Sequence, residues 1–168
     1  MNVINNTINR LQYIAAECPV MIKSIPEAEF SNKPSPGKWS KKELLGHLCD
    51  SGVNNLSRFV TAQFEMQPFK LLKYEQDEWV KFNNYQDDSM ENVLNFWIIL
   101  NKRIIKVIKK IPEDTLGRQC ALGALGDLKE NETKSLLWLI EDYLAHMEYH
   151  LKQIIGDEFK STAKYPQY

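Results

Sequence analysis

Apolar residues recur at intervals of three and four positions along four stretches of the chain. This spacing is typical of helices that bury one face. It predicts helices at about residues 3–17, 40–67, 88–111 and 135–155. Segments rich in proline, glycine and polar residues separate them, and no stretch shows a clear strand pattern. We therefore expect one all-α domain over residues 1–168, built as a four-helix bundle.

Capping signals mark the ends of these helices. Ser40 and Glu43 match the capping box that opens a helix, and Asp88 stands at the corresponding position before the third helix. Pro68 is expected to end the second helix. Gly156 follows the fourth helix, where a residue with positive φ commonly closes the last turn.

The segments between the helices differ in length and character. The connections at 68–88 and 112–132 are long, and a short helix is expected near residues 76–82. Pro19 either kinks the first helix or opens a short second piece. The tail after Gly156 is polar and is expected to lie at the periphery.

Composition narrows the classes of function. The chain has 21 basic and 22 acidic residues, so no basic surplus points to nucleic acid or an anionic membrane. The longest apolar runs are too short to span a bilayer, and the first residues lack the pattern of a secretory signal. The three cysteines are widely spaced, which fits free thiols in a reducing compartment. A cytoplasmic protein is therefore expected.

Three histidines are the candidate chemical centre. His146 and His150 lie four residues apart, so their imidazoles share one face of the fourth helix. His47 lies about 10 Å into the second helix, and His150 lies about 9 Å from the end of the fourth. If these helices are antiparallel neighbours, all three histidines fall at one level.

This arrangement has a consequence for the topology. In a simple up-down-up-down bundle, the second and fourth helices are parallel, and the histidines would lie at opposite ends. A shared site requires an up-down-down-up order, in which one connection crosses the length of the bundle. Both 68–88 and 112–132 are long enough. We expect the crossover at 68–88, between the second and third helices, because its aromatic residues suit packing along the bundle.

Three neutral imidazoles without a fourth protein ligand suit a divalent transition metal such as Zn²⁺ or Ni²⁺. Such a centre has an open position, at which water or a small thiolate could be activated. Cys49 points to another side of the helix than His47 and is a poor fourth ligand. The alternative remains that the histidines are ordinary bundle residues, since the H-x-x-x-H spacing is short and common.

Three segments give the chain a family resemblance. They are KPSPGKWSKKELLGHLCDS at 33–51, YEQDEWV at 74–80 and LAHMEYHLKQI at 144–154. Together they resemble the DinB superfamily, also called DinB/YfiT-like. The resemblance implies an up-down-down-up bundle with a metal held by His47, His146 and His150. It also implies metal-dependent hydrolases, or transferases that use low-molecular-weight thiols, and it implies homodimers.

Other polar residues lie within reach of this centre in sequence. Asp50 and Asp142 lie three or four residues from a histidine, where a carboxylate could accept the second imidazole N–H. Asn54 lies two turns beyond His47 and could reach a group bound at the metal. Ordinary surface roles remain open for all three. Glu148 is expected on the solvent face. Arg58 could bind an anionic group of a substrate, although a position at the surface or in an ion pair is favoured.

Two functions follow from the residues. The first is a metal-dependent hydrolase or thiol S-transferase that acts on a small molecule. The second is a non-catalytic metal- or ligand-binding bundle that serves stability, sensing or a stress response. The absence of an obvious general base favours the second.

Overall fold

Four long helices form the body of the molecule. The computed structural model describes residues 3–123 and 132–162. The long helices are α1 (Val3–Lys23), α3 (Lys41–Thr61), α5 (Met90–Ile108) and α6 (Leu136–Ile155). The short elements are α2 (Glu27–Phe30), β1 (Phe69–Lys70), α4 (Gln76–Asn83), η1 (Tyr85–Asp87), η2 (Glu113–Gly117), β2 (Gln119–Ala121) and β3 (Thr133–Ser135).

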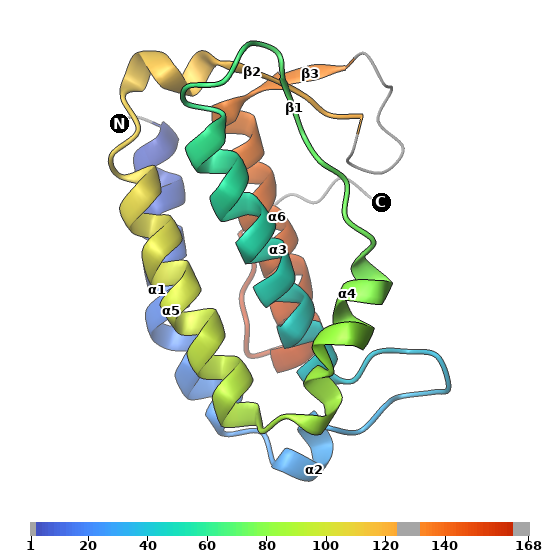
Figure 1. Cartoon of the computed structure of the whole chain (residues 1–168). Helices are drawn as coiled ribbons and strands as arrows, with labels where there is room; N and C mark the ends of the chain where they lie inside the picture. Colours follow the sequence, from blue (N-terminus) through green and yellow to red (C-terminus); the bar gives the residue numbers. More distant parts are fainter. Residues whose placement is uncertain (1–2, 124–131, 163–168) are drawn as a thin grey trace.

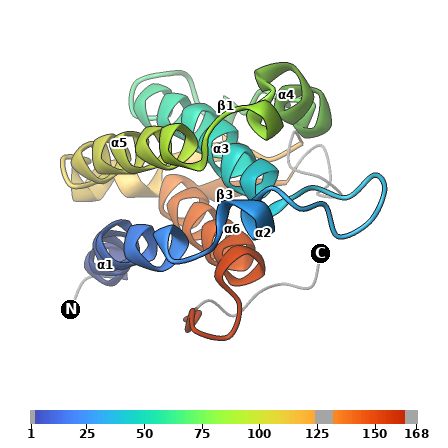
Figure 2. The ribbon, with the colours of Figure 1, turned by 90° about the horizontal axis from the view of Figure 1, so that it is seen from below.

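The helices follow the up-down-down-up order that the histidines required. In Figure 1, α1 and α6 run downward and α3 and α5 run upward. The chain therefore returns from the upper end of α3 to the lower end of α5 through a long crossover, which contains β1 and α4. Seen from below, α4 lies beside α3 on the side away from α1 (Figure 2). The predicted fold class and the predicted crossover are both confirmed.

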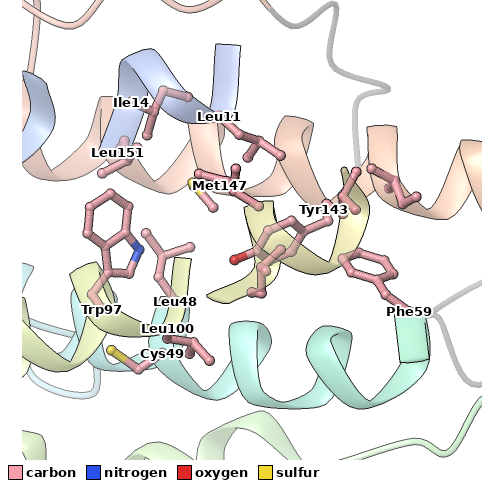
Figure 3. Close-up of a cluster of buried hydrophobic side chains, with 14 of the residues drawn as sticks. Leu11, Ile14, Leu48, Cys49, Phe59, Trp97, Leu100, Tyr143, Met147 and Leu151 are labelled. Carbon is pink, nitrogen blue, oxygen red and sulfur yellow. The ribbon is translucent and has the colours of Figure 1, made fainter. Parts of the chain in front are cut away.

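The buried core lies along the axis of the bundle and draws side chains from all four long helices. Figure 3 shows its central part, where Trp97 and Leu100 of α5 face Leu48 of α3 and Met147 of α6. Each fully buried side chain of this size stabilises the fold by about 1.5–3 kcal/mol. Gly52 permits the close approach of α3 and α5, since a Cβ there would lie 2.6 Å from Leu100 Cδ2.

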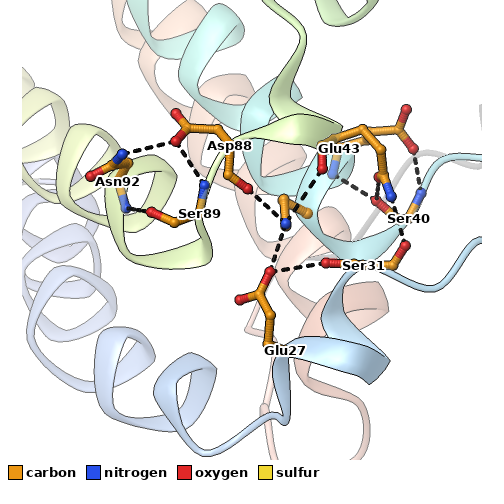
Figure 4. A network of polar contacts seen from close by, with 9 residues as sticks. Glu27, Ser31, Ser40, Glu43, Asp88, Ser89 and Asn92 are labelled. Atoms are coloured by element: carbon orange, nitrogen blue, oxygen red, sulfur yellow. Dashed lines mark hydrogen bonds and ion pairs between the residues drawn. The ribbon is translucent and has the colours of Figure 1, made fainter.

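The predicted start of α3 is confirmed, and the capping residue of α5 differs from the prediction by one position. Ser40 caps α3 in a complete capping box, with its hydroxyl accepting from the Glu43 amide. Ser89, rather than Asp88, caps α5, because its side chain accepts from the Asn92 amide. Asp88 instead accepts from the Ser89 amide and the Asn92 side chain, as Figure 4 shows.

Two helix lengths differ from the prediction. α1 runs through Pro19 to Lys23 without opening a second piece. α3 ends at Thr61, before the expected end near Gln67, because tight turns at Gln63 and Phe64 close it. Gly156 has φ +85° at the end of α6, as predicted.

A buried lysine fixes the lower end of the crossover. Lys42 Nζ lies 2.6 Å from Glu27 Oε1 of α2 and donates to the Asp88 carbonyl at 2.7 Å. Ser40 Oγ donates to the Gln86 side chain at 2.7 Å. These contacts belong to the network in Figure 4. They join α2, the start of α3 and the end of the crossover, which places the connection against the start of α3.

The short strands and the described part of the tail depart from the prediction. β1 pairs in parallel with β2, and β2 pairs antiparallel with β3. Strands of two or three residues carry too little periodicity to be recognised in a sequence. The tail is not wholly peripheral: Phe159 is buried. Tyr165 and Tyr168 of the tail, as well as Gly126 and Asn131 of the connection at 112–132, lie outside the described residues.

The length and apolar character of a helix decide whether it could cross a membrane. Within residues 3–123 and 132–162, no helix combines the length and the apolar character that crossing a bilayer requires.

Candidate metal centre

The three histidines meet at the lower end of the bundle. His47 projects from the first turns of α3, and His146 and His150 project from the last turns of the neighbouring α6. The ring centroids lie 4.7–5.1 Å apart. One potential ligand atom from each ring lies within 4.8 Å of the other two. The antiparallel packing of α3 and α6 thus brings together the residues that sequence spacing placed at one level.

The orientation of the rings leaves nitrogens facing one another. His47 Nε2 lies 3.1 Å from His146 Nε2. The Nδ1 of His146 lies 3.4 Å from Ser51 Oγ. The Nδ1 of His150 lies 2.7 Å from the Oε1 atom of Gln153. Because an amide oxygen only accepts, this contact places the proton of neutral His150 on Nδ1 and leaves a lone pair on Nε2.

Burial keeps these imidazoles neutral. It lowers the pKa of His47 to about 3, and the nearby His150 acts in the same direction. Burial also lowers the pKa of His146 well below its usual range, with further contributions from His150 and His47. Burial lowers the pKa of His150, although Gln153 opposes this shift. Neutral imidazole is the form that binds a metal ion.

The donor set fits a divalent metal ion. Two Nε2 atoms that face each other at 3.1 Å must share a proton or accept the same cation, since two lone pairs repel. In the described part of the chain, the buried Nδ1 atom of His47 has no hydrogen-bond partner. All three residues offer nitrogen, which suits transition metals better than Mg²⁺ or Ca²⁺.

A cavity lies beside the cluster. Its volume is about 640 Å³, within the range of small-molecule sites. His150, Gln153 and Tyr149 of α6 line this cavity, as do Lys38 and Trp39 of the segment before α3. The Trp39 ring also packs on His47, with centroids 5.0 Å apart and planes tilted by 34°. One imidazole of the cluster therefore lines the cavity, while Trp39 covers another.

Asp50 lies one turn beyond His47 among buried polar groups, and the residue is 2% exposed. The Tyr85 hydroxyl and the Asn83 amide both donate to Oδ1, at 2.7 and 2.8 Å. Burial raises the pKa of Asp50 to about 6, and these two hydrogen bonds oppose the shift. Oδ2 has no partner among the described residues. The ring of Tyr85 packs on Gly46, where a Cβ would lie 2.1 Å from Cδ2.

The remaining candidates have other contacts. The Asn54 amide donates to the Asp50 carbonyl at 2.9 Å. Asp142 is half-buried on α6, and its charge acts on Arg58. Sequence reasoning missed Tyr85 and Asn83, because they come from the crossover, and only the three-dimensional path of that segment brings them to α3.

Two expectations about charged residues are wrong. Glu148 is not in solvent but fully buried, and its carboxylate accepts from Arg10, Ser161 and Thr162. It therefore joins α6 to α1 and to the tail. Arg58 is buried rather than at the surface, and its guanidinium donates to the Leu72 carbonyl at 2.8 Å.

Comparisons with known proteins give a consistent result. The family model described as DinB superfamily matches residues 12–154. A protein of Oceanobacillus iheyensis with the provisional name metal-dependent hydrolase is 23% identical over 139 residues, which cover 80% of this chain and 78% of the relative. Among solved structures, YfiT from Bacillus subtilis has a TM-score of 0.78 at 17% identity, covering 92% of this chain and 86% of YfiT. It is described as a probable metal-dependent hydrolase with an unusual four-helix bundle topology.

A second fold relative has a different chemistry. A mycothiol-dependent maleylpyruvate isomerase has a TM-score of 0.67 at 11% identity. The match covers 92% of this chain but only 61% of the isomerase. At these identities, both solved structures support the fold alone.

Proposed function

Because this chain belongs to the DinB superfamily, we propose that it is a metal-dependent enzyme that acts on a small molecule. The observation that carries the proposal is the cluster of three neutral imidazoles beside a cavity of about 640 Å³. His47, His146 and His150 are the proposed ligands, and Zn²⁺ or Ni²⁺ is the proposed ion.

The ion would supply Lewis-acid activation of water or of a thiol. The chain's own residues would hold its ligands in place. Gln153 orients His150 through Nδ1, Ser51 lies against the Nδ1 of His146, and Trp39 shields His47 from solvent. Such outer contacts fix the tautomer and orientation of ligating histidines.

Asp50 is the proposed proton acceptor near the site. Tyr85 and Asn83 hold one of its oxygens, and the other is buried without a partner among the described residues. That oxygen would accept a proton from His47 or from a bound reactant. Asn54 and Asp142 are proposed to line the same region. Substitution of Asp50 by Asn should lower turnover more than it lowers metal affinity.

The reaction is either hydrolysis or transfer to a low-molecular-weight thiol. The provisional name of the Oceanobacillus relative favours hydrolysis, and the likeness to a mycothiol-dependent enzyme favours a thiol cosubstrate. A screen of esters and amides, run beside a screen of electrophiles with and without a thiol, separates the two. Turnover that requires the thiol would assign a transferase.

The second candidate is a metal- or ligand-binding bundle without turnover. The hydrogen bonds of the histidines favour this candidate. Among the described residues, their partners are another histidine, Ser51 and Gln153, and no carboxylate. Saturable metal binding combined with no activity in both screens would support this function.

Elemental analysis of untagged protein tests the proposed centre. About one equivalent of zinc or nickel is expected in the wild type, and none in His47→Ala. Asn101→Ala is the matched control, because it removes a buried polar side chain of α5 that lies outside the cluster. Equal metal content in wild type and His47→Ala would refute the proposed ligand set. The homodimer implied by the resemblance also remains a prediction, which sedimentation velocity checks.

A further inference from the structure

The cavity beside the histidine cluster is lined by four charged side chains as well as by His150. They are Glu29, Lys38, Lys41 and Asp77. Lys41 Nζ lies 2.7 Å from Glu29 Oε1, so these two charges balance each other. Among the described residues, neither Lys38 nor Asp77 takes part in an ion pair. The cavity therefore presents one positive and one negative charge without a partner.

A second cavity, of about 420 Å³, adjoins the first. The residues that line both cavities are Gly37, Lys38, Trp39 and Asp77. The other two lysines of the second cavity have partners: Lys33 lies 2.6 Å from Glu43, and Lys81 lies 3.4 Å from Glu78. The two unpaired charges therefore stand where the cavities meet.

A tight turn fixes the backbone of Lys38. Its amide donates to the Ser35 carbonyl at 3.1 Å, and Gly37 has φ +78°. Pro36 followed by a glycine with positive φ is typical of a type II turn. The next residue, Trp39, packs its ring on His47 with centroids 5.0 Å apart. Lys38 is thus held one residue from a side chain that contacts the histidine cluster.

Asp77 reaches the same space from the crossover. It lies in the first turn of α4, and its neighbour Gln76 also lines the cavity beside the histidines. Figure 1 shows α4 and the segment before α3 on the same side of the bundle. Lys38 and Asp77 therefore line one cavity from two separate segments, but they do not pair with each other.

We propose that this cavity binds a small zwitterion of about the length of a dipeptide, with its carboxylate on Lys38 and its ammonium group on Asp77. The inference rests on the proposed function and names the substrate class of the same site. An extended dipeptide spans about 7 Å, which suits two opposite charges that do not meet directly. The part between its ends would lie in the cavity that His150 lines.

Three small peptides separate the two charges of the ligand. Glycylglycine carries both charges at pH 7, because its terminal amine is largely protonated there. N-acetylglycylglycine lacks the ammonium group, and glycylglycinamide lacks the carboxylate. Each is titrated into the ¹⁵N-labelled chain, and NMR shifts give the dissociation constant. The protein is used as purified, and a second series after removal of metal ions separates binding in the cavity from binding to a metal.

The wild type should bind glycylglycine about three- to tenfold more tightly than either analogue. The expected factor is modest because both side chains are exposed, where solvent screens a charge pair. Lys38→Gln should lose the preference over glycylglycinamide and keep the preference over N-acetylglycylglycine. Asp77→Asn should show the reverse pattern. A merely structural role of either residue would not change one preference and spare the other.

Two matched variants serve as controls. Lys41→Gln removes a lysine that lines the same cavity but is paired with Glu29. Glu78→Gln removes the carboxylate next to Asp77 on α4, which lines neither cavity. Both variants should keep both preferences of the wild type.

The inference is overturned if the wild type binds none of the peptides or binds all three equally. It is also overturned if Lys38→Gln and Asp77→Asn keep both preferences, or if Lys41→Gln loses the same preference as Lys38→Gln. Failure of the metal centre gives a different result. Charge-dependent binding by a protein that takes up no zinc would retain the zwitterion site and refute the proposed metal centre, whereas zinc uptake with equal affinity for the three peptides would do the opposite.

Discussion

Two faces of α6 carry buried polar groups, and their hydrogen bonding differs. On one face, the Glu148 carboxylate accepts from the side chain of Arg10 and from both residues of the Ser161–Thr162 pair. On the other face, His146 and His150 point at His47, and nitrogen faces nitrogen. The chain's own groups satisfy Glu148, whereas the histidine cluster would be completed by a cation. The first pattern is that of a structural polar group and the second is that of a binding site.

The largest effect should follow from removing Glu148. Glu148→Ala leaves the Arg10 guanidinium without its buried partner and releases the tail, so the free energy of unfolding should fall by about 3–5 kcal/mol. Urea denaturation measures this change. Glu158→Ala is the control, because it removes an exposed carboxylate of the same tail. If both variants unfold at the same urea concentration, Glu148 does not have the structural role assigned to it.

The histidine face should respond to metal instead. Zinc at a hundred times its dissociation constant should stabilise the wild type by about 2.7 kcal/mol, because it binds the folded state. His146→Ala should lose this gain, since one of the three donors is missing. Thermal denaturation with and without zinc measures both values. Ser161→Ala, which removes a donor to Glu148, should keep the gain. A zinc-induced gain of the same size in His146→Ala would show that zinc stabilises the protein elsewhere.

The contrast between these faces also explains what could be predicted from the sequence. Apolar spacing and the Ser40 capping box lie within single segments, so the helices were predictable. The histidine cluster was predictable because its ligands lie on two helices whose lengths fix their levels. The environment of Glu148 could not be predicted, since its hydrogen-bond partners come from α1 and the tail. Spacing placed Glu148 away from the ligand face but gave no sign that another segment covers it.

The crossover shows the same limit. Its short helix was predictable from local pattern, but its contacts with α3 were not. Tyr85 and Asn83 reach Asp50, and Leu72 reaches Arg58, only because of the path that the segment takes along the bundle. Sequence therefore gave the residues of the proposed centre and missed the groups that surround them.

Acid should weaken the histidine face of the zinc-free protein. His47 has a pKa of about 3 in the folded state and about 6.5 when unfolded, so the unfolded state takes up a proton first. The contribution of neutral His47 to the free energy of unfolding is present above pH 6.5 and is lost as the pH falls. Between pH 7 and 5 the loss should be about 2 kcal/mol. Urea denaturation across this range measures it, and His47→Ala should show a shallower decline. An equally steep decline in that variant would contradict the assigned pKa.

Asp50 should oppose this decline by a smaller amount. Burial raises its pKa from 3.8 to about 6, so the folded state binds the proton more tightly than the unfolded state does. Stability from this group is present below pH 4 and is lost as the pH rises through 6. Between pH 7 and 5, acid should therefore add about 1 kcal/mol through Asp50. Asp50→Asn keeps an acceptor for Tyr85 and Asn83 but does not titrate, so its zinc-free stability should fall more steeply with acid than that of the wild type. Asp77→Asn, an exposed carboxylate of α4, is the control and should follow the wild type. If Asp50→Asn instead declines less steeply than the wild type, the carboxyl group is charged in the folded protein, and its environment stabilises the anion rather than the acid.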